Sequence, residues 1–107
     1  MTEHYYDVEG LKRLSTIGAL QKEAFEAFMN FDRKVFQEGA VPVKYKELMA
    51  IAAAHITRCP YCIEGHTKRA KKAGATNEEI AEAIMVGVAM SAGAAIAHAS
   101  IAAKAMG

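Results

Sequence analysis

Two cysteines and a histidine lie close together near the middle of the chain, at Cys59, Cys62 and His66. Because proline is tolerated at the first position of a helix, Pro60 predicts that Cys59 is the N-cap of a helix and Cys62 its third residue. Free backbone N–H groups and the positive end of the helix dipole favour a thiolate at such a position. Two cysteines separated by two residues can close a disulfide and reopen it, as a two-electron thiol redox cycle requires.

Two acid–base groups stand at spacings that suit these thiols. His66 follows Cys62 by four residues, so both side chains share one face of a helix, and the imidazole can accept the thiol proton. Glu47 has to come from the preceding helix, from which it can orient His66 or pass a proton onward. His55, four residues before Cys59, is a candidate auxiliary residue. Together these residues predict that a cysteine thiol, the His66 imidazole and the Glu47 carboxylate lie in a row, each within reach of the next.

The elements that must position these residues are predicted to be helices, and the fold class to be all-α. Helices are predicted over residues 8–36, 43–56, 60–72 and 76–104. Gly18 is expected to break the first of them, and Thr76 with Glu79 forms a capping box at the start of the last. The basic run 68–72 is expected to complement the negative end of its helix dipole.

The composition indicates one small domain, residues 1–107, that assembles with copies of itself. The chain has 22 alanines, 4 leucines and no tryptophan. Burial contributes roughly 25 cal/mol per Å² of apolar surface, and alanine offers little such surface. Small residues also line one side of the last helix: Gly87, Ser91, Ala94, Ala95, His98 and Ala102. We therefore expect a compact helical domain that forms a homo-oligomer through helix packing.

Charge and hydropathy argue against several classes of partner. The formal net charge is +1, with both signs scattered along the chain, which is not the pattern of a nucleic-acid-binding protein. The stretch 83–103 carries no formal charge and is long enough to cross a bilayer, but alanine contributes little to membrane insertion. We expect a buried helix there and no membrane partner. The first residues show no signal peptide, so the expected location is cytoplasmic.

The cysteines also admit two other interpretations. Zinc could be held by Cys59, Cys62 and His66 with His55 or His98 as the fourth ligand, although structural zinc sites usually stabilise small loop-rich folds. The Cys-Pro-Tyr-Cys sequence matches glutaredoxin-like proteins, but that fold needs a strand before the first cysteine. The stretch 49–55 that precedes it here is predicted to be helical.

The full pattern resembles a known family. Glu47 followed by Cys59-Pro60-Tyr61-Cys62 and then His66, an E-x11-C-x2-C-x3-H pattern, is similar to the alkyl hydroperoxidase D branch of the carboxymuconolactone decarboxylase-like family. The resemblance covers residues 25–103, including the lead-in at 43–48 and the connection at 73–76. It implies an all-α fold that assembles into trimers or hexamers and reduces hydroperoxides.

The resemblance also implies a role for each site residue. Cys62 matches the cysteine that attacks the peroxide and becomes a sulfenic acid. Cys59 matches the more exposed partner, which resolves the sulfenic acid into a disulfide and meets the reductant. His66 and Glu47 match the proton relay that activates Cys62. The decarboxylase that gives the family its name does not need such a cysteine pair, so the pair argues against that activity.

One position departs from the family pattern. The peroxidase carries a histidine immediately before its second cysteine, and Tyr61 stands there in this chain. A phenol cannot shuttle protons near neutral pH as imidazole does, so the relay is expected to be shorter or to use a nearby histidine such as His55. Tyr61 is thereby a second candidate auxiliary residue.

The sequence therefore predicts a thiol-dependent peroxidase without a bound cofactor or metal. Its expected substrate is a hydroperoxide, and its expected reductant is a dithiol, either thioredoxin-like or lipoyl. Two alternatives stay open: a disulfide reductase or redox sensor with little peroxidase activity, and a non-redox metal-binding or scaffold protein.

Overall fold

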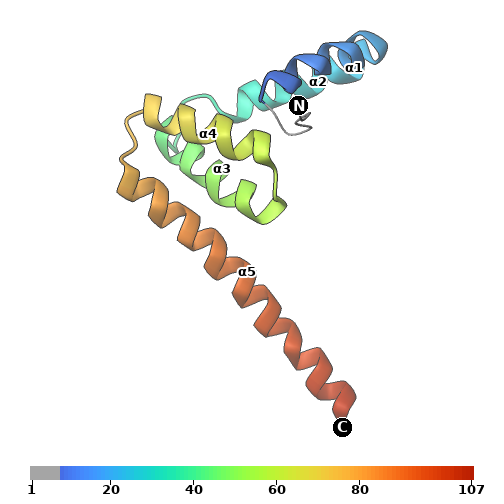
Figure 1. Cartoon of the computed structure of the whole chain (residues 1–107), viewed down its shortest axis with the longest axis vertical. Coiled ribbons are helices and arrows are strands. Elements are labelled where there is room, and N and C mark those ends of the chain that lie inside the picture. The colour runs from blue at the N-terminus through green and yellow to red at the C-terminus, as the bar shows by residue number, and fades with distance from the viewer. Residues whose placement is uncertain (1–7) are drawn as a thin grey trace, which may run out of the picture.

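Residues 8–107 fold into six helical segments. A computed structural model describes residues 8–107, and the elements are labelled in Figure 1. They are the 3-10 helix η1 (Val8–Arg13), α1 (Leu14–Leu20), α2 (Lys22–Val35), α3 (Val43–Thr57), α4 (Pro60–Lys72) and α5 (Asn77–Met106). No strand occurs in residues 8–107, and the all-α prediction is confirmed.

Two helix starts are fixed by local side-chain hydrogen bonds. Cys59 is the N-cap of α4 with Pro60 next to it, and the Cys59 Sγ accepts a hydrogen bond from the backbone N–H of Cys62 at 3.1 Å. At α5, the Thr76 hydroxyl accepts from the N–H of Glu79 at 3.1 Å, and the Glu79 carboxylate accepts from the N–H of Thr76 at 2.8 Å. Both predicted starts are confirmed. They could be predicted because each depends only on neighbouring residues.

The break in the N-terminal region falls at Gln21 rather than at Gly18. Gln21 has φ −134° and ψ 57°, which ends α1 and lets α2 turn back. Gly18 lies inside α1, where an added Cβ would come within 3.0 Å of the Phe25 ring. The glycine therefore allows α1 and α2 to approach each other closely, and the prediction that it breaks the helix was wrong.

The core lies where α3 packs against both α4 and the first half of α5 (Figure 1). Its buried apolar residues are Ile51, Ala70, Ala75 and Ile80, with Leu48 and Ile84 packed against them. Gly87 of α5 meets the backbone of α3 so closely that an added Cβ would lie 2.9 Å from the Ala52 carbonyl oxygen. Small residues therefore let the backbones of α3 and α5 touch.

An ion pair joins the same two helices near the start of α5. Lys44 Nζ lies 3.0 Å from Glu79 Oε2. The hydrogen bond to Glu79 raises the pKa of Lys44 above its ordinary value. The backbone N–H of Thr76, followed by Lys44, lowers the pKa of Glu79. The capping carboxylate thus serves both its own helix and the α3–α5 contact.

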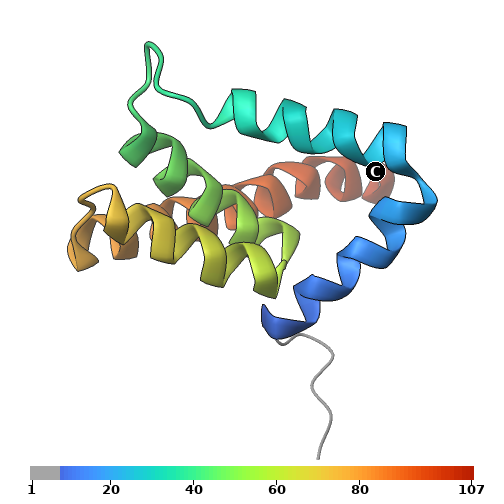
Figure 2. The same ribbon diagram turned by 90° about the horizontal axis from the view of Figure 1, so that it is seen from above.

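The single chain is more open than the compact domain expected from the sequence. Figures 1 and 2 show the α1–α2 hairpin and the far half of α5 extending away from the α3–α4 pair. The radius of gyration is 17.6 Å, against about 13 Å for a compact domain of this length. In the part of the chain that the structure describes, α2 packs on α1 alone among the helices. The expectation of compactness is not met within one chain, because its one small core does not reach these two extensions.

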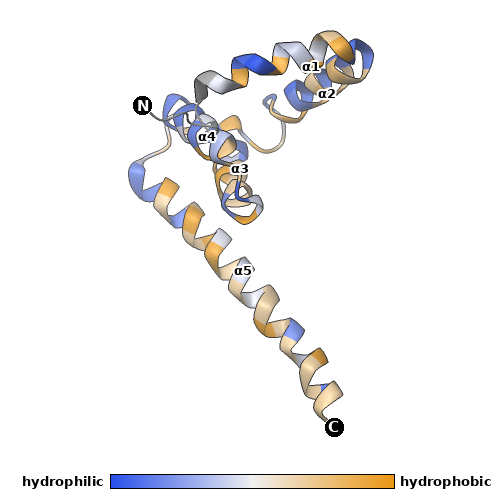
Figure 3. Ribbon diagram, turned by 45° about the vertical axis from the view of Figure 1, so that its right-hand side comes forward, coloured by the Kyte–Doolittle hydropathy of each residue, from blue (hydrophilic) through white to orange (hydrophobic). Residues whose placement is uncertain are grey.

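Helix α5 was expected to be buried, and in the single chain it is not. It is the one helix among residues 8–107 that is long and apolar enough to cross a membrane, judged by length and composition, and only 11% of its most apolar window is buried. Figure 3 shows pale to orange, apolar residues along most of its far half. Its polar side chains bond within the helix, as when His98 Nδ1–H donates to the Ala94 carbonyl oxygen at 2.8 Å. Because α3 packs only on the first half of α5, the apolar residues of the far half are exposed in the single chain.

Candidate functional site

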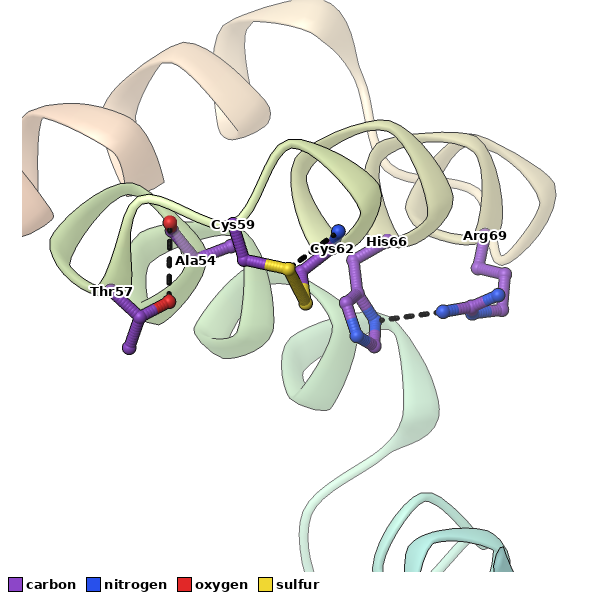
Figure 4. Close-up of a disulfide and its surroundings, with 6 residues drawn as sticks. All are labelled: Ala54, Thr57, Cys59, Cys62, His66 and Arg69. Carbon is purple, nitrogen blue, oxygen red and sulfur yellow. Dashed lines mark hydrogen bonds between the residues drawn. A yellow bond between two sulfur atoms is a disulfide. The ribbon is translucent and has the colours of Figure 1, made fainter. Parts of the chain in front are cut away.

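The two cysteines form a disulfide at the start of α4 (Figure 4). The Cα atoms of Cys59 and Cys62 are 5.2 Å apart, within the range that a disulfide spans. The N–H of Cys62 points at the Cys59 sulfur, so the N-terminal end of the helix dipole acts on Cys59. Both residues are half-buried, and the greater exposure of Cys59 that the family resemblance implies stays a prediction.

The turn from α3 into α4 places this pair. Arg58 adopts a left-handed conformation with φ 59° and ψ 51° and ends α3. The N–H of Cys59 then donates to the Ala54 carbonyl oxygen at 3.1 Å. A single left-handed residue reverses the chain here, so α4 runs back along α3 and its face can meet Glu47.

Glu47 and His66 form a buried carboxylate–imidazole pair. Glu47 Oε1 lies 2.6 Å from His66 Nδ1, although the two residues are far apart in sequence. Glu47 is 3% exposed and is the one buried charged residue in the described part of the chain. An ionised carboxylate only accepts hydrogen bonds, so Nδ1 carries the proton and the Nε2 of a neutral imidazole keeps its lone pair. That lone pair belongs to a ring one turn after Cys62 on the same helix.

Phe36 was missed by the sequence reasoning and contacts this pair. Its ring stacks on the His66 ring with centroids 5.1 Å apart and an interplanar angle of 24°. Lys46 holds the backbone on both sides of Phe36, since its Nζ donates to the carbonyl oxygens of Val35 at 2.8 Å and Gln37 at 2.6 Å. No spacing rule could find Phe36, because it reaches α4 from the loop that follows α2.

Arg69 is the second residue that the sequence reasoning missed as a site residue. Its guanidinium Nη2 lies 3.3 Å from His66 Nδ1, and its Nε lies 3.6 Å from Glu47 Oε2. The expected role of the basic run, to complement the helix dipole, does not include this contact, although Arg69 follows His66 by three residues and so shares its helix face. Figure 4 shows the disulfide, the imidazole and the guanidinium along one side of α4.

The two candidate auxiliary residues lie elsewhere. His55 Nδ1–H donates to the Ile51 carbonyl oxygen at 2.8 Å, and the ring lines a hollow of about 410 Å³ against Gly87 and Ser91 of α5. The hydrogen bond that His55 makes within the described residues goes to its own helix and not to either cysteine. Tyr61 lines a different, mostly apolar hollow of about 450 Å³ formed with η1 and α1. The structure thus pairs Glu47 with His66 and Cys59 with Cys62, with His66 one turn after Cys62 on α4, and His55 belongs to neither pair.

The ligand set of the zinc alternative is not assembled. Within the described residues, no three or more His, Cys, Asp or Glu side chains are arranged to hold a metal ion. The two sulfurs are bonded to each other, and His98 bonds to its own helix on the exposed part of α5.

The fold and the site together define a class: small all-α proteins that carry a Cys-x-x-Cys disulfide at a helix start beside a buried Glu–His pair. Within that class, the chain belongs to the carboxymuconolactone decarboxylase family, whose model matches residues 22–105. The family resemblance predicted from the sequence is confirmed by this match.

Three known proteins show the range of similarity. The chain is 53% identical over 75 residues to a protein of Paracoccus denitrificans described as uncharacterized protein 4 in the cox locus, covering 70% of this chain and 68% of that one. It is 41% identical over 61 residues to an alkyl hydroperoxide reductase of Mycobacterium tuberculosis, covering 57% of this chain but only 17% of that protein. A crystal structure of a Methanobacterium thermoautotrophicum protein superposes with a TM-score of 0.71 at 36% identity, covering 75% of this chain and 90% of that chain.

Proposed function

We propose that this protein is a thiol-dependent peroxidase that reduces hydroperoxides through Cys62 and Cys59. The observation that carries the proposal is the 2.6 Å contact between Glu47 and the Nδ1 of His66. This contact leaves the Nε2 lone pair as the base on the helix face that carries Cys62. A carboxylate that orients a histidine next to a nucleophile is the general arrangement for activating that nucleophile.

The first step consumes the hydroperoxide. His66 takes the thiol proton of Cys62, and the thiolate attacks the terminal oxygen of R–O–O–H. The O–O bond breaks, Cys62 becomes a sulfenic acid, and the departing R–O⁻ takes the proton back from His66 as an alcohol, or as water when R is hydrogen. Sulfur is oxidised by two electrons and the peroxide is reduced by two.

The second step closes the disulfide. The Cys59 sulfur attacks the Cys62 sulfenic acid, an S–S bond forms, and water leaves with the thiol proton of Cys59. The N–H of Cys62 that points at the Cys59 sulfur stabilises negative charge on Cys59 during this attack. An external dithiol, thioredoxin-like or lipoyl, then supplies two electrons and two protons by thiol–disulfide exchange and becomes a disulfide itself.

The relatives support the reaction class more weakly than the geometry does. The name alkyl hydroperoxide reductase belongs to a protein of which this chain matches only 17%. That match and the family membership favour an oxidoreductase of this type, while the assignment of the individual steps depends on the site geometry.

A peroxide-consumption assay with a dithiol donor tests the proposal. Wild type is expected to consume hydrogen peroxide or an organic hydroperoxide continuously, and Cys62→Ser to consume neither. Without the donor, Cys59→Ser is expected to consume one equivalent and stop, with a sulfenic acid on Cys62 that a dimedone probe labels. Ser91→Ala, which replaces an exposed residue on α5, is the control and should match wild type.

Other results would select the alternatives. If wild type consumes no peroxide with any dithiol donor, the peroxidase proposal fails. Reduction of a protein disulfide in the same preparation would then favour the disulfide reductase. Stoichiometric zinc that is lost in both cysteine variants would favour the metal-binding alternative.

We also propose that the protein works as a homo-oligomer, a trimer or hexamer, in the cytoplasm. Large apolar side chains are exposed on both extensions of the chain, with Phe28 and Phe31 on α2 and Ile96 and Ile101 on α5 at 59–75% exposure. Contiguous apolar surface of this kind marks contacts with other molecules. Copies of the chain would cover both surfaces without a membrane, and a reducing compartment supplies the dithiol.

A further inference from the structure

The guanidinium of Arg69 lies against both members of the Glu47–His66 pair. Its Nε is 3.6 Å from Glu47 Oε2, the oxygen that does not contact His66, and its Nη2 is 3.3 Å from His66 Nδ1. Glu47 is almost fully buried, whereas the Arg69 side chain is 57% exposed. The guanidinium is therefore the counter-charge that reaches this carboxylate from the solvent side.

A glycine on α4 leaves space for this contact. An added Cβ at Gly65 would lie 3.3 Å from Arg69 Nη2 and 3.6 Å from Nη1, so the glycine leaves space along which the guanidinium lies. Arg69 follows His66 by three residues and Cys62 by seven, which places all three on one helix face. A basic residue that only served the helix dipole would not need to fold back in this way.

Only one of the two groups that Arg69 contacts can accept a hydrogen bond from it. A guanidinium has donors only, and His66 Nδ1 already gives its proton to Glu47 Oε1 at 2.6 Å, so Arg69 cannot also donate to Nδ1. Its favourable partner is therefore the carboxylate. If the carboxylate turned away, Nδ1 could lose its proton and accept a hydrogen bond from Arg69. The imidazole hydrogen would then sit on Nε2, and Nε2 could no longer act as the base.

We propose that Arg69 is a positioning residue that holds the Glu47 carboxylate so that Oε1 stays on His66 Nδ1. By doing so it keeps the imidazole in the tautomer with a free Nε2 on the side of Cys62. The consequence for peroxide turnover rests on the proposed peroxidase function, but the tautomer itself does not.

Nitrogen NMR of labelled histidine, with peroxidase kinetics, tests this role on the full chain. Arg69→Gln is expected to convert His66 from the Nδ1–H tautomer to a mixture of both tautomers, and to lower kcat/KM about two- to fivefold, as expected when a carboxylate loses a partly exposed ion-pair partner. Arg69→Lys, which keeps the charge without the planar fork, is expected to recover part of both. Lys68→Gln removes the neighbouring cation, which pairs with Glu64 on the exposed face, and should change neither.

Each outcome decides the proposal. If Arg69→Gln keeps the wild-type tautomer of His66, Arg69 does not position the pair and the proposal is wrong. If wild type shows no peroxidase activity, the proposed function fails and the tautomer ratio still decides the role of Arg69. Should Arg69→Gln not fold, the His66 spectrum of Arg69→Lys is measured instead. A spectrum identical to wild type, in both tautomer and line position, would contradict the requirement for the planar guanidinium of Arg69.

Discussion

The His66 ring is restrained from two directions by residues of different elements. Glu47 of α3 fixes the ring nitrogen Nδ1 within its plane, and Phe36, just after α2, covers its face. Rotation of the ring about its Cβ–Cγ bond would break the first contact and tilt the ring against the second. A base held in this way is preorganised, so little reorientation is required when the thiol proton is transferred.

Removing the aromatic face should therefore slow the reaction without unfolding the chain. Phe36→Ala is expected to lower kcat/KM roughly 2- to 10-fold, since an aromatic pair contributes about 0.5–1.5 kcal/mol beyond its buried area. Phe36→Tyr keeps the stacked ring and should stay close to wild type. The measurement is steady-state peroxide consumption by both variants. Equal rates for Phe36→Ala and wild type would show that the stack does not position His66.

The contact of Glu47 with His66 and the pairing of Cys59 with Cys62 could be predicted from the sequence, and the residues that surround them could not. Glu47 and His66 come from helices that follow each other through a tight turn, so a helical pattern is enough to bring them together. Phe36 reaches the site only through the path of the loop before α3, which no local pattern specifies. Arg69 had the right spacing, but the sequence cannot show that the neighbouring Gly65 leaves space for its guanidinium.

At the level of whole elements, the contact between α3 and α5 depends on one glycine. Gly87 is buried, and the Ala52 carbonyl oxygen lies 2.9 Å from the place where its Cβ would be. Helices with small residues at their contact can pack backbone to backbone and gain dispersion energy despite short side chains. Alanine offers little apolar surface to bury, and the sequence therefore predicted a weak core. In this part of the fold, the same small residues are what allows the helices to pack closely.

Gly87→Ala should therefore destabilise the fold. The added methyl must push α3 and α5 apart, and overpacking of this kind costs about 1–3 kcal/mol, which outweighs the gain in helix propensity of at most about 1 kcal/mol. Ser91→Ala, one turn further along α5, should stay within about 0.5 kcal/mol of wild type. Urea denaturation followed by circular dichroism gives both values. A Gly87→Ala variant as stable as wild type would mean that the two helices can shift without cost.

Some helix boundaries could be predicted from the sequence and others could not. The predictable ones depend on residues that are close together in the chain. The starts of α4 and α5 depend on an N-cap, a proline and a capping box, all within a few residues, and were predicted at the observed positions. The break between α1 and α2 at Gln21 has no comparable local signal. There the packing of Phe25 over Gly18 determines the hairpin, and tertiary contact outweighs the expected helix-breaking tendency of glycine.

At the scale of the whole molecule, residues 8–107 leave two of their own apolar surfaces uncovered. The α1–α2 hairpin and the far half of α5 point in different directions from the core, so they do not cover each other within one chain (Figure 1). The sequence predicted the shortage of core side chains but not this openness, because a compact or an open chain can follow from the same helix pattern.

If other copies of the chain cover these surfaces, a charge on either surface should dissociate the assembly. Ile96 of α5 is 75% exposed in the single chain, and burying such a side chain contributes about 1.5–3 kcal/mol. Ile96→Glu removes this contribution from every copy and places a carboxylate in the contact, where an unpaired charge is strongly unfavourable. We expect sedimentation velocity to give a trimer or hexamer for wild type and mainly single chains for Ile96→Glu, with Lys72→Glu at the exposed end of α4 behaving as wild type. A wild-type protein that sediments as a single chain contradicts the assembly, and one that instead floats with phospholipid vesicles assigns α5 to a membrane.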